Sequence, residues 1–137
     1  MRSPHILRVA EGPASFGALF RYLEEAGLRC GWLEYSETEA PPDLAAAAGL
    51  GALRAVSVGR CGSVAVKPRR GAAVLKDLLR ENFRGCALVL LRGEVAAPEL
   101  AAGDQGCRLS FPDGSGRAFS YEELIAALRR PSPWPQA

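Results

Sequence analysis

Basic side chains cluster in one short stretch of the sequence, residues 58–71. Its members are Arg60, Lys67, Arg69 and Arg70. We expect Lys67 to end a β-strand and Gly71 to open a helix whose first amide N–H groups lack partners. Such a helix end attracts anions, and arginine adds bidentate hydrogen bonds to a phosphate or a carboxylate. The sequence therefore predicts an anion-binding site formed by Arg60, Lys67, Arg69, Arg70 and Gly71.

The charge distribution of the whole chain sets this stretch apart. Residues 1–50 contain 4 Arg and Lys against 7 Asp and Glu, residues 51–92 contain 9 against 2, and residues 93–137 contain 4 against 6. One basic region between two acidic ones indicates an anionic partner, either a small ligand or an acidic protein surface. The alternative is a solvated turn whose arginines pair with nearby carboxylates such as Glu37 and Glu39.

Nucleic acid is not a favoured partner of this region. The sequence contains neither GxxxxGK[ST] nor a complete GxGxxG pattern. Proteins that read single strands stack bases on exposed aromatic rings, and residues 51–92 contain one aromatic residue, Phe83, on the expected core face of a helix. The isoelectric point of about 8.5 also lies below the value of about 9 that marks basic nucleic-acid-binding domains.

Cys61 is the residue best suited to nucleophilic catalysis. Its neighbour Arg60 favours the thiolate form of the side chain. A cysteine hydrolase also needs a base, and His5 is the single histidine of the chain, far away in sequence. A turn cysteine without a catalytic role is the simpler interpretation. A small enzyme that acts on a phosphorylated substrate through Cys61 stays the alternative, so whether the protein is an enzyme is left open.

The four cysteines do not have the spacing of a metal site. Cys30, Cys61, Cys86 and Cys107 contain no CxxC pair among them, and zinc sites use close pairs of ligands. We expect no metal and no cofactor. Three of these cysteines stand beside a glycine at the expected start of a strand, where a free thiol packs as a small apolar group.

The hydrophobic pattern of the first half predicts two strands around a helix. Strands are expected at residues 6–10 and 32–36, with Ser15 as the N-cap of the intervening helix and Gly27 just past its end. This order predicts a βαβ unit with parallel strands. Asp43 is expected to cap a short alanine-rich helix that ends near Leu50.

The second half predicts further strands and helices. A hairpin is expected at residues 53–58 and 63–67, an amphipathic helix at 71–82 and a central strand at 87–91. Residues 93–106 are expected to be loop-like, with room for one helical turn at 98–101. A second hairpin at 108–119 precedes a helix that opens with the capping box Ser120–Glu123.

These elements predict a single α/β domain over residues 1–130, with a mixed β-sheet, about four helices and a C-terminal hairpin plus helix. Residues 131–137 are expected to form a flexible Pro-rich tail. No apolar run approaches the ~18 residues that span a membrane, and no signal peptide is evident, so we expect a soluble cytoplasmic protein without a membrane partner. The oligomeric state is open, and a self-assembling subunit with exposed strand edges is a third alternative.

Overall fold

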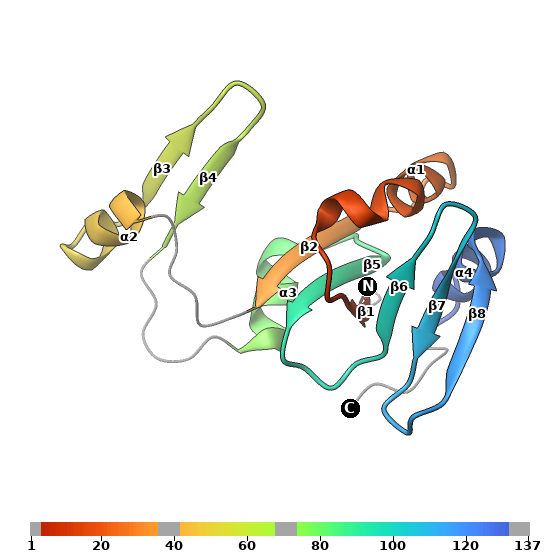
Figure 1. Ribbon diagram of the computed structural model, residues 1–137. Helices are drawn as coiled ribbons and strands as arrows, with labels where there is room; N and C mark the ends of the chain where they lie inside the picture. Colours follow the sequence, from red (N-terminus) through yellow and green to blue (C-terminus); the bar gives the residue numbers. More distant parts are fainter. Residues whose placement is uncertain (1–3, 36–41, 68–73, 132–137) are drawn as a thin grey trace. The chain divides into compact units, whose positions relative to one another are not determined.

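The computed structural model describes residues 4–35, 42–67 and 74–131. Chain contacts divide the molecule into two units (Figure 1). We call residues 1–36 with 76–137 the sheet unit, and residues 37–75 the hairpin unit. The single domain over residues 1–130 stays a prediction, and the Pro-rich tail lies, except for Pro131, outside the described residues.

A six-stranded mixed sheet forms the sheet unit, which confirms the predicted α/β class. Its strands are β1 (His5–Arg8), β2 (Cys30–Tyr35), β5 (Leu88–Gly93), β6 (Glu99–Ala102), β7 (Gly106–Ser110) and β8 (Gly116–Ser120). They are ordered β2-β5-β1-β6-β7-β8, with β2, β5, β1 and β6 parallel and with antiparallel pairing from β6 to β8. Strands β1 and β2 are parallel as predicted, but β5 lies between them.

The first helix begins later than the sequence predicts. A 3-10 turn (Pro13–Phe16) precedes α1 (Gly17–Glu25), so Ser15 lies inside the turn and caps neither element. The proline at the start of the turn fixes the backbone ahead of Ser15 and shifts the first α-helical residue to Gly17. The end of α1 is as predicted: Gly27 has φ +73, and the N–H of Leu28 donates to the carbonyl of Leu23.

One face of the sheet packs against α1 and α4 (Tyr121–Leu128) to form the main core. Its fully buried members include Leu7, Leu19, Leu90, Leu109 and Leu124. The predicted capping box opens α4, with the Ser120 hydroxyl accepting from the Glu123 N–H at 3.1 Å and the Glu123 carboxylate accepting from the Ser120 N–H at 3.2 Å. This cap holds the helix start beside strand β8.

The opposite face of the sheet meets the segment that contains α3 (Leu75–Asn82). Gly31 of β2 allows the Phe83 ring to approach so closely that a Cβ on residue 31 would lie 2.3 Å from it. The predicted start of this helix at Gly71 lies outside the described residues, but Val74 is not helical and α3 begins at Leu75, later than predicted. Leu78 is the buried residue of this helix.

The hairpin unit consists of α2 (Pro42–Gly49), β3 (Ala55–Val58) and β4 (Ser63–Val66). The predicted hairpin is confirmed, with Ala55 opposite Val66 and Val58 opposite Ser63. Among the described residues of this small unit, Ala48 of α2 and Ala55 of β3 are buried. Asp43 lies in the first turn of α2 rather than before it, because Pro42, a residue suited to the first helical position, already belongs to the helix.

None of the helices that the structure describes is long and apolar enough to cross a bilayer.

Candidate binding surfaces

The structure describes two of the five residues predicted to bind an anion. Arg60 lies in the exposed turn between β3 and β4, and Lys67 is exposed directly after β4. Arg69, Arg70 and Gly71 lie outside the described residues. Whether all five side chains converge on one ligand therefore stays a prediction.

The helix that follows this segment begins farther along the chain than a site at Gly71 requires. Its first turn starts at Leu75 and contains the carboxylate of Asp77. A negative side chain at this position already interacts with the positive end of the helix dipole. The described start of α3 therefore adds little attraction for an anion held by Arg69 and Arg70.

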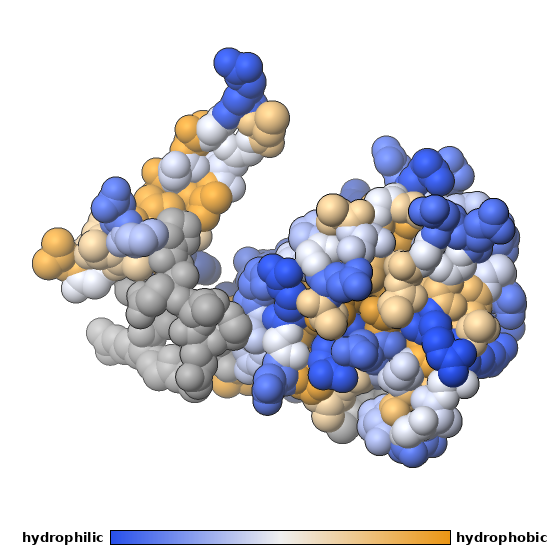
Figure 2. Space-filling model, viewed as in Figure 1, coloured by the Kyte–Doolittle hydropathy of each residue, from blue (hydrophilic) through white to orange (hydrophobic). Residues whose placement is uncertain are grey.

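Large apolar side chains are exposed in the hairpin unit, which also contains Arg60 in the turn between β3 and β4. Among the residues that the structure describes, those with markedly exposed large apolar side chains all belong to the hairpin unit: Leu50, Leu53, Val56, Val58, Val64 and Val74. Leu53 is 86% exposed and Val58 is 79% exposed. Figure 2 shows apolar side chains over β3, β4 and α2. A concentration of apolar surface on a small unit marks an interaction site.

The two valine pairs of the hairpin lie on opposite faces. Val56 is paired with Ala65, and Val64 is paired with Ser57, so each face receives its valines from one strand only. Both faces are therefore partly apolar. The sequence predicted the alternation within each strand, but not the register that separates the two pairs.

The described part of the hairpin unit is also basic. It carries Arg54, Arg60 and Lys67 against a single acidic residue, Asp43. All four of these residues are exposed. The unit therefore combines a positive charge with exposed valine and leucine side chains.

Cys61 and His5 belong to different units of the molecule. Cys61 is exposed in the turn of the hairpin unit. His5 is 5% exposed at the start of β1 in the sheet unit, where its Nε2 is 2.6 Å from the carbonyl oxygen of Arg130. The buried imidazole thus contacts the backbone just after α4, which favours a structural role for His5.

Thiol labelling distinguishes a reactive Cys61 from an ordinary turn cysteine. Burial raises the pKa of Cys30 to about 12 and that of Cys107 to about 11, so both thiols stay protonated and slow to react. We expect iodoacetamide at neutral pH to label Cys61 first, at the rate of a free model thiol, and Cys30 and Cys107 only on unfolding. Mass spectrometry of the digested protein measures each site. Labelling of Cys61 well above the model rate would instead favour the catalytic alternative.

A second charged cluster lies at the carboxyl end of strands β2 and β5. Arg92 donates from Nε to Glu34 Oε2 at 3.0 Å and from Nη2 to Glu34 Oε1 at 2.6 Å. Trp32 Nε1 donates to Glu34 Oε1 at 2.9 Å, and the Arg92 guanidinium lies 5.7 Å from the centre of the Trp32 ring. The bidentate pair joins two strands whose residues are 58 positions apart in sequence.

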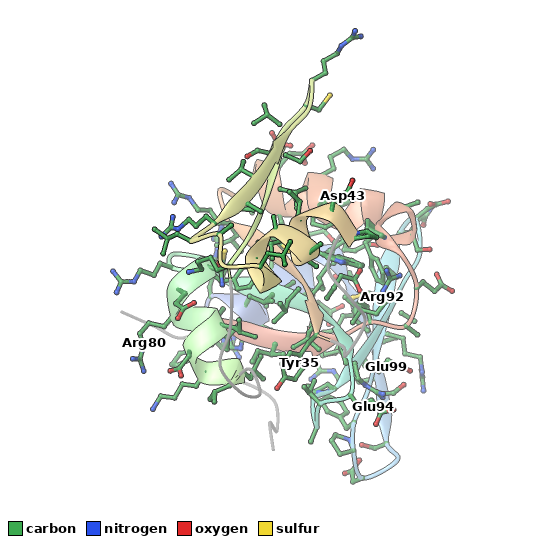
Figure 3. All side chains as sticks on the ribbon, turned by 90° about the vertical axis from the view of Figure 1, so that its left-hand side faces the viewer. Tyr35, Asp43, Arg80, Arg92, Glu94 and Glu99 are labelled. Carbon is green, nitrogen blue, oxygen red and sulfur yellow. The ribbon has the colours of Figure 1, made fainter. Side chains whose placement is uncertain are left out.

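A longer ion pair joins the neighbouring strands β1 and β6. Arg8 Nη2 is 3.5 Å from Glu99 Oε1, and the buried Nε of Arg8 has no hydrogen-bond partner. Figure 3 labels Tyr35, Arg92, Glu94 and Glu99, which come from strand ends and a loop at this edge. Parallel α/β sheets commonly bind ligands here. An anion at Arg92 would have to displace Glu34, so this cluster primarily ties strand ends together.

This cluster was not predicted from the sequence. Glu34 and Arg92 each stand one residue before the end of a strand. A charged residue at the end of an apolar strand was the sequence feature that could have indicated this site. The pairing itself depends on β5 lying beside β2, which the sequence did not predict. In the described parts of the chain, no group of three His, Cys, Asp or Glu side chains is placed to hold a metal ion.

The Glu34 carboxylate gives the sheet unit a pH-dependent stability. Hydrogen bonds from Arg92 and then Trp32 lower the pKa of Glu34 below its ordinary value of 4.5. A depressed folded-state pKa stabilises the fold above 4.5, and this contribution disappears as pH falls through the folded-state pKa. Because the side chain is 47% exposed, we expect Glu34→Gln to lower the free energy of unfolding by less than about 1 kcal/mol at neutral pH. Urea unfolding should show the difference vanishing in acid; a difference that persisted there would exclude the ionic origin.

The chain matches no protein-family model, and no curated protein matches it significantly in sequence. The structure defines an α/β protein with a mixed six-stranded sheet and a separate two-stranded hairpin. Its function is therefore inferred from the chemistry of its surfaces.

Proposed function

We propose that the hairpin unit is a non-catalytic interaction module that binds an acidic protein surface. The observation that carries the proposal is the concentration of exposed leucine and valine side chains in the unit that also presents Arg54, Arg60 and Lys67. The cations orient the partner and accelerate its approach. Burial of the apolar side chains against the partner adds a favourable hydrophobic contribution to binding.

An acidic protein explains more of this surface than a small anion does. A phosphate or a carboxylate would use the basic residues, including Arg69 and Arg70, but would leave Leu53 and Val58 exposed. The described start of α3 at Leu75, with Asp77 in its first turn, also weakens the case for a helix-end phosphate site. A protein partner contacts both kinds of side chain at once.

An acidic protein is also favoured over nucleic acid. Residues 37–75 contain no Phe, Trp or Tyr on which a base could stack. Exposed valines gain nothing from phosphate contacts, which nucleic-acid binding chiefly requires. Nucleic acid is therefore the negative comparison in the experiment that follows.

Fluorescence anisotropy with labelled probes tests this function. The probes are poly-L-glutamate, a glutamate peptide of equal charge with interspersed valines, a single-stranded oligonucleotide and a DNA duplex, with inorganic phosphate as competitor. We expect salt-sensitive binding of both peptides and tighter binding of the peptide that contains valine. Leu53→Ser with Val58→Ser should remove only the difference between the two peptides. Stronger binding of either DNA probe at equal salt, or full competition by millimolar phosphate at constant ionic strength, would overturn the assignment.

A further inference from the structure

Among the residues that the structure describes, β3 is the one strand that pairs with β4, so the outer edge of β4 has no strand partner there. Gly59 N–H donates to the Gly62 carbonyl at 2.7 Å, and hydrogen-bonded pairs alternate along an antiparallel ladder. The pairs Ser57–Val64 and Ala55–Val66 therefore face inward, while the N–H and C=O groups of Ser63 and Ala65 point away from β3. A two-stranded sheet of this size is marginal by itself, so adding strands to it is favourable.

We propose that this edge pairs with the same edge of a second copy of the chain. A two-fold axis at Ala65 places Ala65 opposite Ala65 of the other copy, with their outward-pointing groups in hydrogen-bonding register. Val64 of each copy then lies opposite Val66 of the other copy, which gives two such pairs. The product is a four-stranded antiparallel sheet with a row of four valines on one face.

Charge favours β4 over β3 as the paired edge. In the β4 register Lys67 lies opposite the neutral Ser63 of the other copy. On β3, the register that opposes Val56 to Val58 also opposes Arg54 to Arg60, which places like charges together. Arginines at both ends of β3 protect that edge from further pairing. Pairing through β4 therefore closes at a dimer and does not extend into a filament.

The dimer also keeps the two basic turns apart. Antiparallel pairing directs the turns to opposite ends of the sheet, each about four residues from the axis. At about 3.4 Å per residue the turns are roughly 27 Å apart, well beyond the screening length of about 8 Å at physiological salt. Repulsion between the two copies of Arg60 is therefore small, and both turns stay accessible.

Sedimentation velocity of the full chain over a range of concentrations tests the pairing. We expect a reversible monomer–dimer equilibrium for the unmodified chain. Ala65 is exposed, so Ala65→Lys and Ala65→Glu should fold normally, yet each should be monomeric because like charges then meet across the axis. An equimolar mixture of the two variants should dimerise again. Ser57→Lys, which adds the same charge to β3, should still dimerise.

Three results would overturn the inference. They are an unmodified chain that stays monomeric at its highest attainable concentration, dimerisation that survives in both Ala65 variants, and a mixture of the Ala65 variants that stays monomeric. Circular dichroism of each variant checks that the fold is retained. Because this measurement uses no acidic probe, its outcome is independent of the proposed binding function.

Discussion

Replacing Gly93 by alanine is expected to lower the free energy of unfolding by at least about 3 kcal/mol. Gly93 ends β5 opposite Tyr35, the last residue of β2, and has φ +155. A Cβ at this position would lie 1.9 Å from the Tyr35 carbonyl oxygen. The left-handed backbone alone costs an L-residue about 1–3 kcal/mol, and removing the overlap requires the two strands to separate.

Gly17→Ala is the matched control for Gly93→Ala. Gly17 is the first residue of α1, has φ −57, and no atom lies within 4 Å of the Cβ that alanine would add. We expect this variant to be stabilised by up to about 1 kcal/mol, because alanine loses less backbone entropy on folding. Urea unfolding measures both variants. A Gly93→Ala protein within about 0.5 kcal/mol of the unmodified chain would contradict the described end of β5.

Leu90→Ala is expected to lower the free energy of unfolding by about 2–5 kcal/mol. Leu90 is fully buried and lies between Leu7 on β1 and Trp32 on β2. It belongs to the core that the sheet forms with α1 and α4. Truncation removes apolar contact and leaves a cavity that rigid neighbouring strands cannot fill. The same urea experiment measures the loss.

Leu53→Ala makes the same chemical change at an exposed position. Leu53 is 86% exposed in the hairpin unit, so its truncation should alter stability by no more than about 0.5 kcal/mol. Similar effects of the two truncations would contradict the assignment of Leu90 to the core. The pair therefore separates buried from exposed leucine without changing residue type.

Local sequence patterns predicted several elements because their signals act within a few residues. The continuous apolar run Ala87–Leu91 indicated a central strand covered on both faces, and its last four residues, Leu88–Leu91, are 0% exposed. Gly27 and the Ser120–Glu123 capping box marked helix ends through short-range hydrogen bonds. Such features depend little on the remainder of the chain.

Elements that depend on distant partners were not predictable in the same way. Residues 93–106 were expected to be loop-like, with room for one helical turn at 98–101, but residues 99–102 form strand β6 between β1 and β7. Pairing with the two neighbouring strands decides their conformation. The insertion of β5 between β1 and β2, and with it the Glu34–Arg92 pair, also depends on long-range packing.

The candidate binding surface was partly predictable. The sequence placed Arg60 in a hairpin turn, which is confirmed, and Lys67 as the last residue of a strand, whereas β4 ends one residue earlier at Val66. The exposure of Val58 and Leu53 was not predicted, because alternating valines indicate a strand but not whether anything covers it. The start of α3 at Leu75 was missed because apolar periodicity defines a helix face more sharply than a helix boundary.

Charge reversal at Arg60 and Lys67 tests whether the hairpin unit binds acidic polypeptides through its basic residues. The measurement is the dissociation constant for the valine-containing glutamate peptide, determined for the unmodified chain, for Arg60→Glu with Lys67→Glu, and for Arg21→Glu with Arg84→Glu. Arg21 and Arg84 are exposed residues of the sheet unit, so the control pair changes the net charge equally. We predict that reversal in the hairpin unit weakens binding about tenfold or more, about 1.4 kcal/mol, while the control pair has a much smaller effect. Equal losses for the two pairs, or no loss for the first, would contradict the assignment.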